Sequence, residues 1–143
     1  MNTDKIAKEI SKLVPVMVRH MYPFVFDPID LSPSQVLALS TLYEKGDCSI
    51  GELSRAMHNT APTMSGIVNR LERSGHIKRQ RKGQDRRVVT IILTNKGIEV
   101  AKRFRMNIMR RWQFILSKLP AQEGENILNV LKKITKGFLD GSI

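Results

Sequence analysis

Positively charged side chains crowd into one short stretch of this sequence, which is suited to binding phosphate groups. Between residues 70 and 87 the chain carries eight lysines and arginines but only two acidic residues. Arginine can offer paired hydrogen bonds to phosphate oxygens, and lysine adds a point charge. The alternative is a solvated run of charges, but cations at a helix end and along a hairpin favour a binding surface. The cations are Arg70, Arg73, Lys78, Arg79, Arg81, Lys82, Arg86 and Arg87, and the acidic residues are Glu72 and Asp85.

The charge of the whole chain indicates a polyanionic partner. A net charge of +11 over 143 residues attracts nucleic acid, whereas an aromatic content of 6% offers little for stacking against unpaired bases. The excess of cations begins at residue 48. Residues 1–47 hold five Lys and Arg against six Asp and Glu, and residues 48–94 hold nine against three. We therefore predict double-stranded DNA, rather than a single strand, as the partner.

The residues that catalysis or metal binding would need are scattered or missing from the sequence. The three histidines, His20, His58 and His76, stand far apart, and there is no glycine-rich phosphate loop and no Cys/His spacing typical of a metal site. Cys48 is the only cysteine, which excludes a disulfide within the chain. We predict no enzymatic activity, no metal and no cofactor.

The hydropathy pattern indicates a protein that does not engage membranes. No apolar run approaches the roughly 18 residues that a bilayer-spanning helix needs, and the first residues lack the apolar segment of a signal peptide. A basic helix on a membrane surface is a weaker alternative around Arg110 and Arg111, since Trp112 falls on the apolar side of its helix. We expect a cytoplasmic protein.

One helix must position the cationic stretch, and its pattern is the clearest in the chain. Met64, Ile67, Val68 and Leu71 recur at intervals of three and four, which places them on one buried face of a helix. Thr60 is a suitable N-cap, proline is tolerated in the first turn, and Gly75 suits a left-handed stop. The opposite face is small and polar, as a helix that enters a groove requires. It carries Pro62, Thr63, Ser65, Gly66, Asn69, Arg70 and Arg73.

A hairpin and several further helices complete the prediction. Residues 76–81 and 87–93 have the β-branched content of strands, and the turn between them, residues 82–86, is charged. Helices are expected at residues 4–22, 32–46, 49–57, 95–119 and 122–139, with a kink or break at Pro15 and a proline-rich loop at residues 22–28.

The predicted architecture is mainly α with a small β-wing. A winged helix-turn-helix over residues 31–94 is joined to a helical dimerisation layer from both chain ends, residues 1–30 and 95–143, in a single domain spanning residues 1–143. The apolar helices at the chain ends carry more apolar surface than the chain itself could cover, which favours a homodimer. A monomeric helical subdomain is the alternative.

The chain resembles the MarR family of bacterial and archaeal transcriptional regulators over almost its whole length. The segment from Leu31 to Leu39 resembles the second helix of the family, and Ile50 to Ser54 resembles the third. Residues 62–75 are similar to the recognition helix. The most specific match is the wing signature Asp-x-Arg at Asp85 to Arg87, followed by Leu93, Thr94 and Gly97.

The resemblance implies a winged-helix DNA-binding regulator and roles for individual residues. In such a protein Asp85 pairs with an arginine to hold the wing, while Arg87 or Arg86 enters the minor groove. A narrow A·T minor groove is electronegative, which suits an arginine at a turn tip. Thr63, Ser65, Asn69 and Arg70 become candidates for base or phosphate contacts, with Arg73, Arg79 and Lys82 also at the DNA.

The resemblance also implies that a small aromatic or anionic effector could bind. The candidate ligand site is formed by Arg19, His20, Tyr22, Phe24, Phe26 and Tyr43, although these aromatic residues could instead serve only to pack the first helix. His76 stands where the family usually has an apolar residue, and we expect it to be partly exposed. Members of the family that sense oxidation use a cysteine in the first helix, where this chain has none.

We therefore predict a sequence-specific regulator of transcription that acts as a homodimeric, ligand-responsive repressor on a pseudo-palindromic operator. A constitutive architectural DNA-binding protein without an effector is the alternative. The sequence does not reveal the operator, the regulated genes or the effector.

Overall fold

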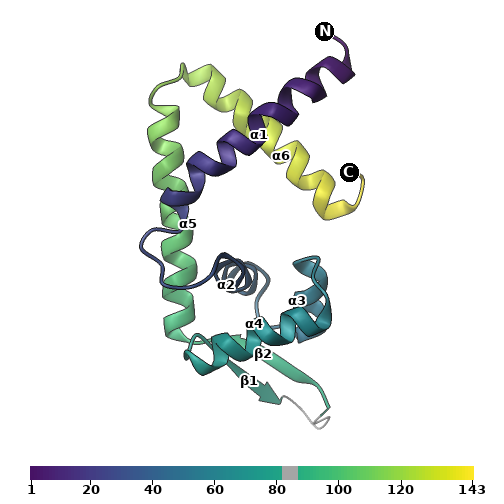
Figure 1. The fold of residues 1–143 in the computed structure, drawn as a ribbon, viewed down its shortest axis with the longest axis vertical. Helices are drawn as coiled ribbons and strands as arrows, with labels where there is room; N and C mark the ends of the chain where they lie inside the picture. Colours follow the sequence, from purple (N-terminus) through teal and green to yellow (C-terminus); the bar gives the residue numbers. More distant parts are fainter. Residues whose placement is uncertain (82–86) are drawn as a thin grey trace. The chain divides into compact units, whose positions relative to one another are not determined.

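The computed structural model describes residues 1–81 and 87–143, and confirms a mainly helical fold with a small two-stranded sheet (Figure 1). The chain divides into two compact units, Met1–Ile108 and Met109–Ile143, which we describe separately. The elements in chain order are α1 (Thr3–Val25), α2 (Pro33–Lys45), α3 (Ile50–Ala56), α4 (Ala61–Arg73), β1 (Ile77–Arg81), β2 (Val89–Leu93), α5 (Asn95–Leu116) and α6 (Ala121–Asp140).

The first unit is built around α2, α3 and α4, which gather beside the sheet (Figure 1). Their buried side chains form one apolar core, in which α4 contacts α2, α3 and β1. Both α2 and α3 begin with a side-chain cap: the Ser32 and Gln35 side chains cap α2 reciprocally, and the Ser49 hydroxyl accepts a hydrogen bond from the Glu52 amide. The most deeply buried members of the core are Leu39, Leu42, Leu53, Met64, Val68, Leu71, Ile77 and Ile91.

The sheet is an antiparallel pair in which Ile77 faces Leu93 at one end and Arg81 faces Val89 at the other. Cys48 adds a bridge to Ile91 on the other side of β2, with its carbonyl oxygen accepting from the Ile91 amide at 2.7 Å. The chain segment before α3 therefore covers the edge of β2 that β1 leaves open. The predicted turn between the strands, residues 82–86, lies outside the described residues.

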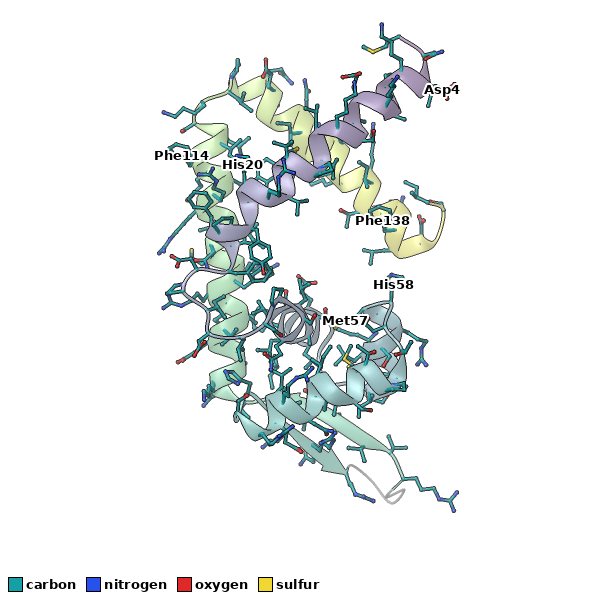
Figure 2. All side chains as sticks on the ribbon, in the orientation of Figure 1. Asp4, His20, Met57, His58, Phe114 and Phe138 are labelled. Carbon is teal, nitrogen blue, oxygen red and sulfur yellow. The ribbon has the colours of Figure 1, made fainter. Side chains whose placement is uncertain are left out.

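The turn between α3 and α4 is tight. Met57 ends α3, and His58 adopts a left-handed backbone conformation with φ of 53°. Figure 2 labels both residues at this corner, where the His58 amide donates to the Arg55 carbonyl and the Asn59 amide to the Ser54 carbonyl. Thr60 then caps α4. This compact turn sets the angle between the two helices of the motif.

Helix α1 differs from its prediction in two ways. It runs without interruption through Pro15, so the expected break is wrong, and it includes Pro23, so the expected loop at residues 22–28 begins too early. A proline within a helix removes one hydrogen bond and crowds the carbonyl four residues earlier. Tertiary packing offsets that loss at the end of α1, because Val25 is buried there.

A second apolar cluster joins the end of α1 to α2 and α5 within the first unit. Val25, Val36 and Phe104 are its buried members. The Phe26 ring lies between the Tyr22 ring, with centroids 4.8 Å apart, and the Phe104 ring, at 5.3 Å. The rings of Tyr22 and Phe26 thus pack in a row against α5. The Asn107 amide fixes the backbone here by donating to the Val25 and Asp27 carbonyls at 3.0 and 2.6 Å.

The second unit contains the last turns of α5 and all of α6, separated by a turn at Pro120. Phe114 extends from α5 and is exposed (Figure 2), with the Arg111 guanidinium 5.4 Å and the Lys118 ammonium 5.3 Å from its ring centre. One face of α6 leaves large apolar side chains in contact with solvent. These are Leu128, Val130, Leu131, Ile134, Phe138 and Leu139.

Candidate nucleic-acid interface

Helix α4 has one buried face and one exposed polar face, as its periodicity predicts. Its four apolar residues at positions 64, 67, 68 and 71 are at most 2% exposed. The Thr60 hydroxyl accepts a hydrogen bond from the Thr63 amide at 3.4 Å, and Gly75 after the helix has φ of +79°. The predicted DNA-facing residues Pro62, Thr63, Asn69, Arg70 and Arg73 are exposed, and Ser65 and Gly66 are half-buried.

Gly66 makes the centre of the exposed face shallow. A Cβ added there would have as its nearest neighbour the Arg70 Nη2 atom at 3.9 Å, which is ordinary van der Waals contact. The position therefore has room for a side chain within the protein itself. Only a partner that approaches this face closely would require glycine.

Arg79 is held in place by contacts within the protein, which the sequence did not predict. Its Nη1 donates to Glu72 Oε1 at 2.6 Å and its Nη2 to Asn69 Oδ1 at 2.7 Å, while its backbone amide donates to Glu72 Oε2 at 3.2 Å. The side chains of Glu72 and Asn69, which both belong to α4, thereby join this helix to β1. The only signal in the sequence is an acidic residue, Glu72, among the cations that surround it.

The basic residues of the hairpin can be placed in part. Lys78, Arg81 and Arg87 are exposed, and Arg79 is half-buried. The predicted sites Lys82, Asp85 and Arg86 lie outside the described residues. The roles predicted for the wing tip therefore remain predictions.

The C-terminal end of α4 is fastened to the start of α5 by Thr94. Its hydroxyl donates to the Gly75 carbonyl at 2.6 Å and accepts from the Gly97 amide at 3.3 Å, while its own amide donates to the His76 carbonyl at 3.1 Å. A Cβ at Gly97 would collide with that same His76 carbonyl oxygen. The spacing of Leu93, Thr94 and Gly97 thus reflects one helix cap and one close backbone approach.

His76 lies inside this junction, and the expectation that it is partly exposed is wrong. It is 6% exposed, and its Nδ1 lies 2.6 Å from the Ser74 hydroxyl oxygen. That hydroxyl also lies 3.1 Å from the Leu71 carbonyl, to which it can donate its single proton. The imidazole then donates from Nδ1. The polar side chain of His76 is accommodated where the family usually has an apolar residue because it has a hydrogen-bond partner.

The surroundings of His76 disfavour its charged form. Burial, and to a smaller extent the Lys96 ammonium, lower the pKa of His76 below its ordinary value of 6.5. Lys96 is held close by because its Nζ donates to the Ser74 carbonyl at 2.8 Å. The junction therefore favours a neutral imidazole.

The candidate ligand site overlaps only in part with a hollow in the structure. A hollow of about 280 Å³ is lined by apolar atoms of Val14, Met17, Val18, Met21, Tyr22, Val25 and Phe26. Of the six predicted residues, only Tyr22 and Phe26 line it. Arg19, His20 and Phe24 are exposed on α1, where His20 Nδ1 lies 2.8 Å from the Val16 carbonyl, and Tyr43 is half-buried on α2.

Cys48 is a buried core residue, 3% exposed, just before α3. Burial, followed by the nearby Glu52 carboxylate, raises the pKa of its thiol. A neutral, enclosed thiol is a poor nucleophile. Cys48 therefore packs as a small core residue.

Neither a metal cluster nor a membrane span is present in the described part of the chain. Residues 1–81 and 87–143 contain no group of three or more His, Cys, Asp or Glu side chains arranged to hold a metal ion. Within the same residues, no helix combines the length and apolar character needed to cross a bilayer.

Comparison with known proteins identifies the family. The sequence pattern of the MarR family matches residues 31–89. The HTH-type transcriptional regulator PapX of Escherichia coli is 30% identical over 112 residues, which cover 78% of this chain and 68% of PapX. The chain belongs to the MarR family, whose members here are named as transcriptional regulators and not as enzymes.

Solved structures of this family share the fold. A MarR family protein from Bacillus stearothermophilus has a TM-score of 0.84 and 26% identity, covering 97% of this chain and 99% of that one. A point mutant of MepR from Staphylococcus aureus, solved bound to an oligodeoxyribonucleotide, has a TM-score of 0.67 and 25% identity, covering 90% and 97%. The winged helix-turn-helix arrangement predicted from the sequence is therefore confirmed.

The buried His76 makes stability sensitive to acid. Its folded pKa is lowered, so the unfolded chain takes up a proton first as the pH falls below 6.5, and the free energy of unfolding decreases there. We expect His76→Gln to weaken this decrease between about pH 7.5 and 5.5, because glutamine does not titrate.

Thermal unfolding across this pH range measures the effect, and the comparison uses the slope against pH, not the absolute stability. Lys96→Met is the second variant, since removing the neighbouring ammonium brings the pKa of His76 closer to its ordinary value. Equal slopes for wild type and His76→Gln would contradict the assignment.

Proposed function

We propose that this chain is a homodimeric regulator that binds double-stranded DNA by placing α4 in the major groove, and that it acts as a ligand-responsive repressor on a pseudo-palindromic operator. The division of α4 into a buried apolar face and an exposed polar face carries the proposal. A helix with small residues at the centre of its outer face can enter the major groove and reach the base edges. The MepR mutant that was solved bound to an oligodeoxyribonucleotide shares the fold, which supports DNA as the partner.

The charges around α4 support a duplex partner. Arg70 and Arg73 stand on the helix, and Lys78 and Arg81 on the adjacent strand, so cations flank the exposed face on two sides. Phosphate contacts of this kind fix the register of a protein on DNA without reading its sequence. We assign that role to Arg73, Lys78 and Lys82, base or phosphate contacts to Thr63, Ser65, Asn69 and Arg70, and the minor-groove contact to Arg87 or Arg86 held by Asp85.

Gly66 offers the sharpest test of DNA binding. We expect Gly66→Glu to reduce affinity for duplex DNA at least about 100-fold, because it places bulk and negative charge where the DNA would lie. Fluorescence anisotropy with a duplex selected by the wild-type protein measures the change. Wild-type affinity should also fall steeply with salt, with a slope of about −0.9 per neutralised phosphate in log K against log salt.

Gly66→Ala is the matched control for folding. The site has room for a Cβ, and alanine in a helix is more stable than glycine by about 1 kcal/mol. The alanine variant should therefore melt at or above the wild-type temperature while losing a smaller part of its DNA affinity. Normal binding by Gly66→Glu would mean that another face of α4 meets the DNA.

The homodimer is proposed from the apolar surface of α1. Ile10, Leu13, Val14, Met17 and Val18 are each roughly half exposed and recur on one side of the helix. Soluble monomers rarely leave so large a contiguous apolar surface in water. A second copy of the chain, contributing the same face through a two-fold axis, would cover it.

Two neighbouring valines on α1 test this assignment. Val18 lines the hollow and is 57% exposed, whereas Val16 is 42% exposed and lies on the opposite side of the helix. We expect Val18→Glu to convert the dimer to a monomer at micromolar concentration, because a buried carboxylate would be costly at the interface. Val16→Glu should remain dimeric. Analytical ultracentrifugation distinguishes the two, and equal behaviour of both variants would contradict the interface.

The effector is proposed to bind in the hollow beside Tyr22 and Phe26, which a second copy of the chain would enclose. The lining is apolar, so an aromatic ring fits it better than a charged group does. Arg19 and His20, exposed on the same helix, are the candidate partners for a carboxylate. Ligand binding would favour one arrangement of the two recognition helices and weaken DNA binding.

Salicylate and its neutral analogue salicylamide test the effector. We expect salicylate at millimolar concentration to raise the melting temperature by linkage and to lower duplex affinity severalfold. Salicylamide, which has the same ring without the negative charge, shows whether the ring alone produces these two effects. If the ligand stabilises the protein but leaves its DNA affinity unchanged, ligand binding does not regulate DNA binding. If neither compound stabilises the protein, a constitutive architectural protein is favoured.

A further inference from the structure

Asn69 is an exposed amide on α4 whose orientation is set by its neighbours. Its Oδ1 accepts a hydrogen bond from Arg79 Nη2 at 2.7 Å. Arg79 is in turn held by Glu72, through a 2.6 Å ion pair at Nη1 and a 3.2 Å bond from its backbone amide to the second carboxylate oxygen. Glu72 therefore holds Arg79 by both its guanidinium and its backbone before the side chain reaches Asn69.

The chemistry of these groups allows only one orientation of the amide. A guanidinium has five N–H donors and no acceptor, so the atom of Asn69 that faces Arg79 must be the oxygen. The amide nitrogen then points to the other side of the planar group. Within residues 1–81 and 87–143, no protein acceptor takes a hydrogen bond from this nitrogen. Since Asn69 is exposed, the nitrogen is presented to whatever approaches α4.

We propose that Glu72 and Arg79 fix Asn69 as a hydrogen-bond donor toward DNA, which makes Asn69 a specificity-determining residue and Glu72 and Arg79 positioning residues. This inference rests on the proposed function, in which the exposed face of α4 lies in the major groove. It goes further by stating which hydrogen-bonding pattern that face presents at one position.

The consequence is a base preference that differs from that of an unconstrained asparagine. A free asparagine amide reads adenine bidentately, with its nitrogen donating to N7 and its oxygen accepting from the N6 amine. In this chain Arg79 takes one of the two lone pairs of that oxygen and brings its positive charge beside the other, which disfavours a hydrogen bond from the amine of adenine. Guanine offers two acceptors, O6 and N7, thymine offers O4, and cytosine presents only a donor. Asn69 should therefore favour guanine or thymine and disfavour cytosine.

Selection from a randomised duplex library with the full-length protein tests the inference. Asn69→Ala identifies the base pair that Asn69 reads, because preference should disappear at that position alone. At that position the wild-type protein should bind guanine or thymine at least about fivefold more tightly than cytosine. Competition titrations with the selected duplex and its single-base variants give these ratios.

Two further variants change the hydrogen-bonding pattern in opposite ways. Asn69→Asp keeps an oxygen for Arg79 but replaces the outward nitrogen with a second oxygen, so the preference should move to the bases that present an amine donor, cytosine and adenine. Arg79→Met releases Oδ1, so adenine should rise to the level of guanine or above it. The aspartate is close in size to asparagine and sits on the surface, so folding is not at risk.

Lys78→Met is the matched control. It removes an exposed cation from the same strand without touching Asn69, so it should weaken binding to all duplexes alike and leave the order of base preference unchanged.

The outcomes separate the inference from the function on which it rests. A wild-type preference for adenine, or an unchanged base order in both Asn69→Asp and Arg79→Met, would overturn the inference while leaving DNA binding intact. A uniform loss of affinity in Asn69→Ala, with no single position affected, would also overturn it, since Asn69 would then contact phosphate. Failure of the wild-type protein to bind any duplex above background would overturn both.

Discussion

The structure depends on how the three residues that follow α4, Ser74 to His76, satisfy their backbone carbonyl groups. These groups lie beyond the regular hydrogen bonding of the helix and must find partners elsewhere. Thr94 supplies two of the bonds, from its hydroxyl to Gly75 and from its amide to His76, while the Lys96 ammonium supplies a third, to Ser74. The same hydroxyl caps α5. One residue thus binds the segment after α4 and caps α5, which fixes the two helices to each other across the hairpin.

A second set of contacts holds the other side of α4, where Arg79 reaches back from β1 to Glu72 and Asn69. The two sets differ in kind. The first is directed at backbone carbonyl groups, so it positions the helix. The second is solvent-accessible and joins side chains, so it arranges the surface that the helix presents. Positioning and recognition are thereby handled by different residues, and the surface can change without loosening the fold.

The parts of the fold that depend on local chemistry were predictable from sequence. Spacing and caps predicted α4, from Thr60 to Gly75, because a buried stripe and its end signals lie within a few neighbouring residues. The break expected at Pro15 was wrong, because α1 remains helical there despite the hydrogen bond that a proline removes. The burial of His76 and the engagement of Arg79 could not be predicted, since the His76 backbone contacts the start of α5 and Arg79 meets side chains of α4, and only folding brings these elements together. The candidate site residues on α4 were predicted from their residue types and from the helix face on which they lie. The hydrogen bonds that they form were not predicted.

The two edges of the small sheet are protected by different means. One edge of β2 is covered by the bridge from Cys48 to Ile91, whereas the outer edge of β1 is not paired with another strand among the described residues. An open edge is a template on which strands of other molecules can assemble, and charged side chains are a common defence. Lys78, Arg79 and Arg81 give β1 that defence. The cations of this strand therefore serve colloidal stability as well as the DNA contact proposed for them, and replacing them with apolar residues would promote aggregation.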